Sequence, residues 1–241
     1  MRVACYTGTR NLYEAMVPAV KSLLIHSNVE KIYLLIEDDI FPYELPDCVE
    51  TINVSNQTYF KKDGPNMKSR FTYMALMRAA VAKMFPEHDK MLVLDVDTII
   101  EEDISELFDI DLGNNYFAAV PEPDRCKGGK NHTSLDMYTN IGVTVYNLKL
   151  LRDSRKADVV LESLNMYKYQ FMEQDCFNEC CQGYILPLSN EYNSTNECVY
   201  PFTGYCKRPK VIHYAGIKLD DYVHKFDVQK YNRIPWSDIR K

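Results

Sequence analysis

The chain has no run of eighteen apolar residues, and this absence argues against a membrane-spanning helix. Its first residues, MRVACYTGTRN, turn polar too early to form the apolar segment of a secretory signal peptide. From these two absences we expect a cytoplasmic protein.

An excess of positive charge is also lacking. The 241 residues include 28 Lys and Arg against 34 Asp and Glu, a formal net charge of −6. A general nucleic-acid binder would normally show a basic face, so we expect no nucleic-acid partner. Internal repeats and low-complexity linkers are lacking as well. We therefore expect a single domain over residues 1–241, with a C-terminal tail from about residue 219.

The eight cysteines lack the paired C-x2-C spacing of common zinc sites. Cysteines of a cytoplasmic protein are mostly reduced thiols, and we expect that state here. Five of them lie between residues 176 and 206, so a structural zinc site is the alternative. Cys176 and Cys180 are spaced to share one face of a helix. The others are Cys5, Cys48, Cys126, Cys181, Cys198 and Cys206.

Short apolar segments typical of β-strands alternate along the chain with longer helical patterns. This alternation predicts an α/β fold in which helices cover a mainly parallel sheet. The expected strands are residues 2–7, 31–37, 49–54, 91–100, 115–120, 141–148 and 210–213. The expected helices are residues 14–26, residues 70–85 and a short turn at 104–109.

Three polar segments interrupt this alternation, at residues 55–69, 122–136 and 189–209. In an open α/β sheet, ligands bind at the carboxyl ends of the strands, where such loops gather. These segments are either lids and substrate walls or ordinary surface loops.

Two carboxylates stand within the apolar strand pattern MLVLDVDTII, residues 91–100. Asp is disfavoured in strands, and a buried carboxylate without a partner is costly. On a strand, Asp95 and Asp97 would point to the same face about 6.6 Å apart. A divalent cation between them would compensate both charges. The alternative is that they cap a turn or the next helix.

A positive charge lies in the middle of the apolar face expected for the 70–85 helix. Arg78 falls within a stripe that recurs at the helical period. A guanidinium buried there needs an anion, which is either a protein carboxylate or a ligand phosphate. The apolar positions of the stripe are Phe71, Met74, Ala75, Ala82 and Phe85.

The segment KVIHYAGIK, residues 210–218, adds a third group of candidates. His213 ends a short apolar strand and can supply a nitrogen ligand to a metal. Gly216 lets the backbone approach a phosphate closely, and Lys218 can neutralise that phosphate. The alternative is that His213 is an ordinary, partly buried histidine.

Taken in order, these segments resemble glycosyltransferase family 8. HDKMLVLDVDTIIEEDISELFDIDLGNNYFAAV is similar to the family's D-x-D segment, and YTNIGVTVYNLKLLRD to its N-A-G-V-x-x-I-N-L-x-x-W-R segment. FMEQDCFNECCQGYILPLSNEYN resembles D-Q-D-x-L-N and the following P-L-x-x-x-Y-N, and HYAGIK resembles H-F-x-G-x-K. The similarity runs from Val3 to Lys218.

The resemblance implies a GT-A fold, a Rossmann-like α/β/α sandwich around a mixed, mainly parallel sheet. It also implies a retaining, metal-dependent transfer of a hexose from a UDP-sugar to a glycan or other hydroxyl acceptor. UDP-glucose and UDP-galactose are the favoured donors. The implied cofactor is Mn²⁺, with Mg²⁺ as the alternative, and its ligands would be Asp95, Asp97 and His213.

The resemblance further assigns donor and catalytic residues. Thr7, Thr9 and Asn11 would bind uracil and ribose, and Gly216 and Lys218 the diphosphate. Gln174, Glu173 and Asp175 are alternative catalytic residues, among which the sequence does not choose. Glu173 and the pair Leu219-Asp220 depart from the usual Asp and Pro-Trp of the family. The remaining donor-binding candidates are Arg78, Val96, Glu122 and Asn140.

Two other functions fit parts of the sequence. LVLDVDTII also matches the nucleophile motif of haloacid-dehalogenase-type phosphatases, with Asp95 as nucleophile, Asp97 as acid and base, and Mg²⁺ bound. That motif usually lies near the start of its domain, unlike here. The second alternative is an inactive nucleotide-sugar-binding module. The tail mixes basic and aromatic residues, so it is either a short solvated segment or a peripheral membrane contact.

Overall fold

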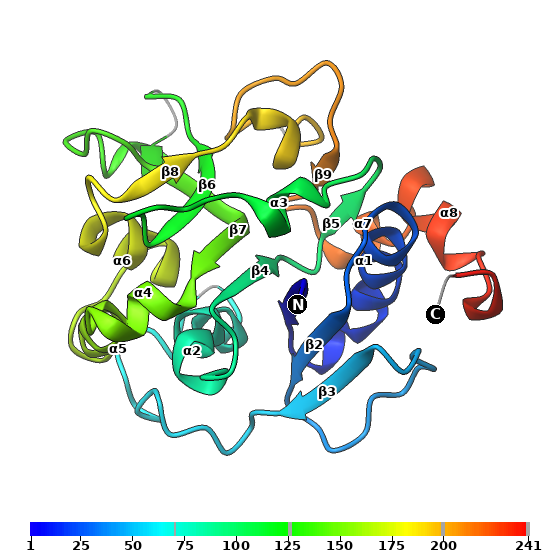
Figure 1. Ribbon diagram of the computed structural model, residues 1–241, viewed down its shortest axis with the longest axis horizontal. Helices are drawn as coiled ribbons and strands as arrows, with labels where there is room; N and C mark the ends of the chain where they lie inside the picture. The colour runs from blue at the N-terminus through cyan, green and yellow to red at the C-terminus, as the bar shows by residue number, and fades with distance from the viewer. Residues whose placement is uncertain (70, 125–126, 199–200, 240–241) are drawn as a thin grey trace.

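The computed structural model describes residues 1–69, 71–124, 127–198 and 201–239, and its centre is a seven-stranded sheet (Figure 1). The strand order is β3-β2-β1-β4-β7-β6-β8. These strands are β1 Val3–Thr7, β2 Lys31–Ile36, β3 Val49–Asn53, β4 Lys90–Leu94, β6 Phe117–Pro121, β7 Thr139–Asn147 and β8 Ile185–Pro187.

The central sheet is mixed and mainly parallel. β1 is parallel to β2 and β4, β2 is parallel to β3, and β8 is parallel to β6. β7 is antiparallel to both β4 and β6. A separate antiparallel pair is formed by β5 (Thr98–Ile100) and β9 (Val211–His213). The expected α/β class and mainly parallel sheet are confirmed.

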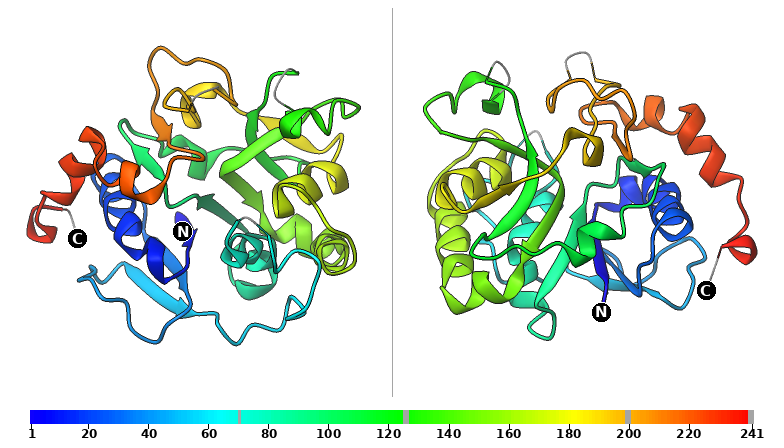
Figure 2. Two further views of the ribbon diagram at one scale, coloured as in Figure 1. Left: turned by 180° about the vertical axis from the view of Figure 1, so that it is seen from behind. Right: turned by 45° about the horizontal axis from the view of Figure 1, so that its top comes forward.

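Alternate residues of β1 point into two apolar cores, one on each face of the sheet. Ala4 and Tyr6 belong to the core that contains α1 and α8, whereas Val3 and Cys5 belong to the core that contains α2, α5 and α6. Figures 1 and 2 show these two groups of helices on opposite sides of the strands. The helices are α1 Tyr13–His26, α2 Met77–Met84, α3 Glu106–Asp109, α4 Leu148–Asp153, α5 Lys156–Met166, α6 Met172–Cys180, α7 Leu219–Tyr222 and α8 Phe226–Asn232.

The expected continuous strand over residues 91–100 is wrong. β4 ends at Leu94, β5 begins at Thr98, and a tight turn joins them. The hydroxyl of Thr98 donates to the carbonyl of Asp95 at 2.7 Å, and the amide of Asp95 donates to the carbonyl of Gly142 at 2.8 Å. Asp95 and Asp97 therefore belong to a turn at the carboxyl end of β4, and no strand has to bury them.

The expected helix over residues 70–85 begins later than predicted. Arg70 lies outside the described residues, and Phe71 precedes the helix and is 39% exposed, so it does not belong to a buried stripe. A 3-10 turn at Tyr73–Leu76 leads into α2, and the Oγ1 of Thr72 caps it by accepting the amide of Met74. The polar cap residue sets the start of the helix at this point.

The C-terminal segment is packed onto the fold, so the expectation of a solvated tail is wrong for residues 219–239. α8 contacts α1, and the hydroxyl of Tyr231 donates to the carbonyl of Ile100 at 3.0 Å. Arg240 and Lys241 lie outside the described residues. The buried side chains of the segment are Tyr222, Val228, Tyr231 and Ile239.

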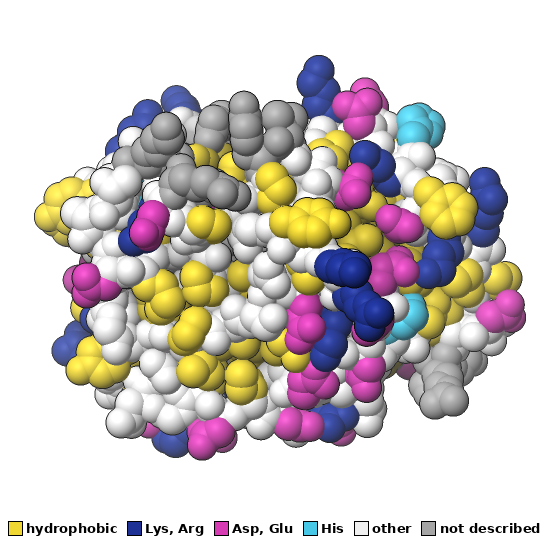
Figure 3. Space-filling view, turned by 90° about the horizontal axis from the view of Figure 1, so that it is seen from above, with side chains coloured by type: hydrophobic (Ala, Val, Ile, Leu, Met, Phe, Trp, Pro, Cys, Tyr) yellow, Lys and Arg dark blue, Asp and Glu magenta, His cyan; other side chains and the backbone are white. Residues whose placement is uncertain are grey.

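Charges of both signs alternate over the right-hand part of the upper face of the molecule (Figure 3). In the C-terminal segment, Lys225 pairs with Glu197 at 3.3 Å and Lys230 with Glu101 at 2.9 Å. Among the described residues, no helix is both long and apolar enough to cross a bilayer.

Candidate active site

A cavity of about 600 Å³ lies where β1 and β4 end, between β7, α6 and β9. Ligands of open α/β sheets bind at this edge. The cavity brings together eleven of the predicted site residues, which are Thr7, Arg78, Asp95, Val96, Asp97, Glu122, Asn140, Glu173, Gln174, His213 and Gly216.

Two carboxylates and one imidazole converge at the floor of the cavity. The Nε2 of His213 lies 3.4 Å from the Oδ2 of Asp95 and 3.3 Å from the Oδ1 of Asp97. The pairing of β5 with β9 places Thr98 opposite His213, so the turn before β5 lies beside the end of β9. Asp95 and Asp97 are distant from His213 in the sequence, and the pairing of β5 with β9 brings them together.

The glycine at position 142 leaves the space in which these ligands meet. A Cβ added to Gly142 would lie 2.1 Å from the Cε1 of His213 and 2.9 Å from the Oδ2 of Asp95. Real Cβ atoms do not approach other atoms this closely, so any larger residue would displace both side chains. Gly142 lies in the segment YTNIGVTVYNLKLLRD, but no local pattern in the sequence indicates this role.

Electrostatics at this point favour a cation. Burial by itself raises the pKa of Asp95, but the charge of Arg78 and the contact with His213 outweigh burial and lower it to about 2. Burial by itself lowers the pKa of His213, but Asp97 and Asp95 outweigh burial and raise it to about 9. The two carboxylates thus stabilise a positive charge between them, whether it is an imidazolium or a metal ion.

Arg78 on α2 is buried next to this group, as its place in an apolar stripe indicated. It is 2% exposed, and its Nη1 donates to the carbonyl of Ile141 at 3.0 Å. Its Nη2 lies 3.0 Å from the Oδ1 of Asp95, but without the angles of a hydrogen bond. Within the described part of the chain, the Nε and Nη2 of Arg78 have no hydrogen-bond partner. Arg78 therefore pairs with Asp95 by charge and holds that carboxylate beside His213.

The other end of the cavity is lined by an amide and carboxyl cluster. The Oε1 of Gln174 accepts the amide of Ile141 at 3.2 Å, and its Nε2 donates to the hydroxyl of Tyr138 at 2.9 Å. The same Nε2 lies 3.4 Å from the Oε1 of Glu122. Burial raises the pKa of Glu122 to about 7 and that of Glu173 to about 7. This end of the cavity can both donate and accept hydrogen bonds to hydroxyl groups.

Asp175 does not line the cavity. It is 1% exposed and accepts hydrogen bonds from the hydroxyl of Tyr138 at 2.6 Å and the amide of Phe171 at 2.8 Å. Its Oδ1 also lies 3.2 Å from the Nε2 of His132. Asp175 therefore holds Tyr138, which in turn contacts Gln174.

Thr9, Asn11 and Lys218 also lie outside the cavity lining. The hydroxyl of Thr9 donates to the Oδ1 of Asn11 at 2.7 Å, just after β1. Lys218 is the N-cap residue of α7. All three lie within two residues of the lining residues Leu12, Thr7 or Gly216 along the chain.

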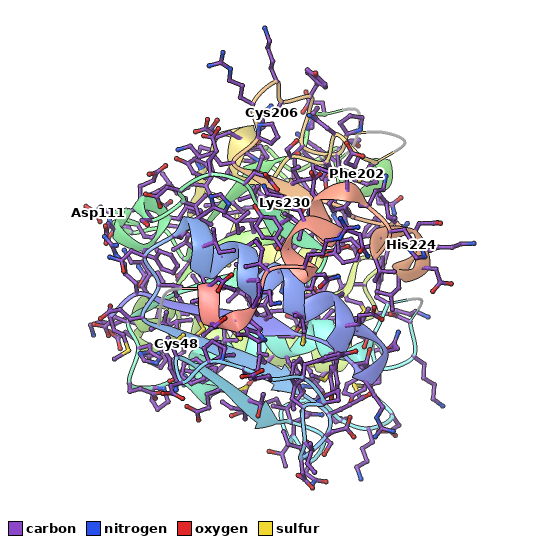
Figure 4. All side chains as sticks on the ribbon, turned by 90° about the vertical axis from the view of Figure 1, so that its right-hand side faces the viewer. Cys48, Asp111, Phe202, Cys206, His224 and Lys230 are labelled. Atoms are coloured by element: carbon purple, nitrogen blue, oxygen red, sulfur yellow. The ribbon has the colours of Figure 1, made fainter. Side chains whose placement is uncertain are left out.

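The cysteines do not assemble a metal site in the described part of the chain. In that part, three potential metal ligands lie close together at Asp95, Asp97 and His213, and this group contains no cysteine. Cys48 and Cys206 are far apart (Figure 4), while Cys176 and Cys180 share one face of α6 with their sulfurs 3.9 Å apart. The seven described cysteines are free thiols, and Cys126 lies outside the described residues.

Several similar proteins are named as glycosyltransferases. A putative glycosyltransferase of Haemophilus influenzae is 26% identical over 171 residues, which cover 65% of this chain and 52% of that protein. The lipopolysaccharide 1,2-glucosyltransferase of Escherichia coli is 33% identical over 115 residues, which cover 44% of this chain and 33% of that protein. The probable glycosyl transferase Gly of Streptococcus gordonii is 26% identical over 250 residues, which cover 94% of this chain and 34% of that protein. The chain spans about a third to a half of the length of these relatives.

Solved structures show the same fold. The bifunctional glycosyltransferase WbbM matches 98% of this chain with a TM-score of 0.74 at 18% identity, over 50% of its own chain. GlyE of Streptococcus pneumoniae matches 99% with a TM-score of 0.68 at 22% identity, over 62% of its chain. The galactosyltransferase LgtC matches 98% of both chains with a TM-score of 0.66 at 16% identity. The fold is therefore the expected GT-A fold.

The profile described as Glycosyl transferase family 8 matches residues 5–218. This range includes the turn at Asp95 and Asp97, the cluster around Gln174 and the strand that ends at His213. The phosphatase alternative, which rested on the 91–100 motif alone, is thereby rejected. Because the profile covers most of its length, the chain belongs to glycosyltransferase family 8.

Proposed function

We propose that this chain transfers a hexose from a UDP-sugar to a glycan or another hydroxyl acceptor, with retention at the anomeric carbon. The observation that carries the proposal is the convergence of Asp95, Asp97 and His213 in the cavity of a family 8 fold. UDP-glucose and UDP-galactose are the favoured donors, since a glucosyltransferase and a galactosyltransferase are among the similar proteins. Residues 1–241 would act as one GT-A unit.

The three ligands fit a divalent cation. Their donor atoms all lie within 4.8 Å of one another. Adjacent ligands around an octahedral ion at about 2.1 Å are about 3.0 Å apart, close to the separations between His213 and the two carboxylates. Carboxylates suit Mg²⁺ and Mn²⁺, and imidazole suits transition metals, so we propose Mn²⁺ and keep Mg²⁺ as the alternative. When bound, the ion would stabilise the charge that develops on the departing UDP.

The nucleotide would occupy the part of the cavity next to β1 and α7. We assign Thr7, Thr9 and Asn11 to the uracil and ribose, because Thr7 ends β1 and the other two follow it directly. Gly216, with a φ of +78°, lines the cavity and gives the diphosphate close access to the backbone. The flexible side chain of Lys218, two residues further on, would neutralise the diphosphate.

The hexose would occupy the amide and carboxyl end of the cavity. Arg78 lines the cavity, so we assign its positive charge to the donor sugar-nucleotide. Glu122 and Asn140 offer further hydrogen-bonding groups, and a site of this kind rejects donors whose hydroxyls do not match.

Gln174 and Glu173 are the catalytic candidates that line the cavity. Gln174 is held at both ends of its amide, so it presents a fixed dipole to the reacting carbon. Glu173, which is 6% exposed and keeps its proton up to about pH 7, is the second candidate. Because Asp175 is committed to Tyr138 and Phe171, we propose that it positions Gln174 through Tyr138.

The test is release of UDP from UDP-glucose and UDP-galactose with Mn²⁺ and no acceptor. We expect slow release to water from one of these donors, and EDTA should stop it. Asp97→Asn and His213→Ala should each lose most Mn²⁺-dependent UDP binding in calorimetry, while Asp153→Asn, an exposed carboxylate on α4, should bind as wild type does. Unchanged affinity in both site variants would overturn the assignment. UDP binding without turnover of any nucleotide sugar would indicate the inactive module.

A further inference from the structure

We propose that Asn193 is a positioning residue that holds the metal ligand His213 and the sugar-facing amide of Asn140 in one fixed arrangement. This inference rests on the proposed function. Asn193 follows the 3-10 turn Asn190–Tyr192, is 0% exposed and does not line the cavity. Any effect on the reaction must therefore pass through its neighbours.

The orientation of each amide follows from one backbone donor. The amide of Gly142 donates to the Oδ1 of Asn140 at 3.0 Å, and a backbone N–H cannot accept, so the oxygen of Asn140 must face it. The same oxygen lies 2.9 Å from the Nδ2 of Asn193, which must supply the proton. The Oδ1 of Asn193 then faces the Nδ1 of His213 at 2.8 Å and accepts from it.

On the metal side, this hydrogen bond determines which nitrogen of His213 is available. With Nδ1 donating to Asn193, the Nε2 faces Asp95 and Asp97 and is the nitrogen that can ligate an ion. Groups that orient a ligating histidine in this way typically change metal affinity by about 10- to 100-fold when they are removed.

On the sugar side, the same amide decides which end of Asn140 faces the cavity. Because the Oδ1 of Asn140 is occupied by Gly142 and Asn193, its Nδ2 faces the Oε1 of Glu122 at 3.4 Å. The Nε2 of Gln174 faces that oxygen as well, also at 3.4 Å. Reversing the amide of Asn140 would bring two oxygens together and disturb the hydrogen bonds offered to the hexose.

Two substitutions separate these roles. Asn193→Asp keeps an acceptor for His213, now a carboxylate, but replaces the donor to Asn140 by a second oxygen, so it should weaken the sugar side and not the metal side. Asn193→Ala removes both contacts. A matched control is Thr203→Val, because the buried hydroxyl of Thr203 donates to the backbone carbonyl of Asn193 and leaves its side chain untouched.

The experiment is calorimetry of UDP with Mn²⁺ and of a non-hydrolysable UDP-hexose with Mn²⁺, on each variant. Asn193→Ala should bind Mn²⁺–UDP about 10- to 100-fold more weakly. Asn193→Asp should bind Mn²⁺–UDP at least as tightly as wild type does but lose the extra affinity that the hexose contributes. Thr203→Val should match wild type for both ligands, and circular dichroism should show the native fold.

The outcomes separate this inference from the proposed function. A wild-type protein that does not bind UDP with Mn²⁺ would contradict the proposed function itself. If wild type binds, the inference is overturned by an Asn193→Ala variant with wild-type Mn²⁺–UDP affinity, or by an Asn193→Asp variant in which both affinities fall alike. Should Asn193→Ala fail to fold, the isosteric Asn193→Asp decides by the contrast between its two affinities.

Discussion

Replacing Gly142 by Ala should destroy the metal site while leaving the fold. The added Cβ would lie 2.1 Å from the Cε1 and 2.6 Å from the Nδ1 of His213, and 2.9 Å from the Oδ2 of Asp95. The strand is held on the side of β4, because the carbonyl of Gly142 accepts the amide of Asp95 at 2.8 Å and the next residue, Val143, pairs with Leu94.

The size of the effect follows from these distances. Carbon atoms in contact are about 3.5 Å apart, so the ring of His213 must shift by more than about 1 Å. Metal–ligand distances tolerate about 0.2 Å, so the ring can no longer ligate the same ion as the two carboxylates. We expect at least a 100-fold loss of Mn²⁺-dependent UDP affinity, equivalent to about 2.7 kcal/mol. Overpacking should cost a further 1–3 kcal/mol of stability, roughly, which most domains survive.

The assay is calorimetry of UDP with Mn²⁺, alongside a thermal melt. Gly183→Ala is the control, because an added Cβ meets nothing within 4 Å there. Its φ of +78° means that the substitution costs stability only through backbone strain, about 1–2 kcal/mol. Gly183→Ala should therefore lower the melting temperature but keep the affinity for UDP. Wild-type affinity in Gly142→Ala would refute the reasoning, because it would mean that His213 and Asp95 need not occupy the positions seen here.

The remaining predictions concern the buried carboxyl, the catalytic amide, the cysteines and the C-terminal segment. Burial raises the pKa of Glu122 from 4.5 to about 7, so its stabilising contribution is complete below pH 4.5 and is lost as the pH rises through 7. The free energy of unfolding of Glu122→Gln relative to wild type should therefore rise between pH 5 and pH 8, by up to about 3 kcal/mol. Urea unfolding that gives the same difference between the two proteins at both pH values would contradict this. Gln174→Ala should slow UDP release without weakening UDP binding, as measured by steady-state kinetics and calorimetry. Elemental analysis of the His213→Ala variant should find no stoichiometric zinc, and one zinc per chain in that variant would overturn the thiol assignment. Tyr231→Phe loses the hydrogen bond to Ile100 and should lower the free energy of unfolding by about 1 kcal/mol; no change would mean that the C-terminal packing is not held by this contact.

Local patterns in the sequence determined the fold class and most of the candidate site. Strand and helix periodicities depend on residues close in the chain, so the alternation that predicts an α/β fold is readable without a structure. The carboxylates of Asp95 and Asp97 in a strand pattern and the charge of Arg78 in an apolar stripe each break a local rule, and such breaks often mark functional residues. The order of four motifs then indicated the family.

Only the tertiary structure decided which of these residues meet. The split of residues 91–100 into β4, a turn and β5 depends on pairing with β9, more than a hundred residues later, and periodicity carries no record of such pairing. The same holds for the burial of Asp175, the packing of residues 219–239 and the placement of Asn193 behind His213. The unpredicted helix α5 is different, because its buried residues Ala157, Val160, Leu161 and Leu164 follow a local helical pattern. Burial and hydrogen-bond partners arise from contacts between distant segments, so a polar residue in a loop pattern gives no sign of whether it faces solvent, a ligand or the group that orients a ligand.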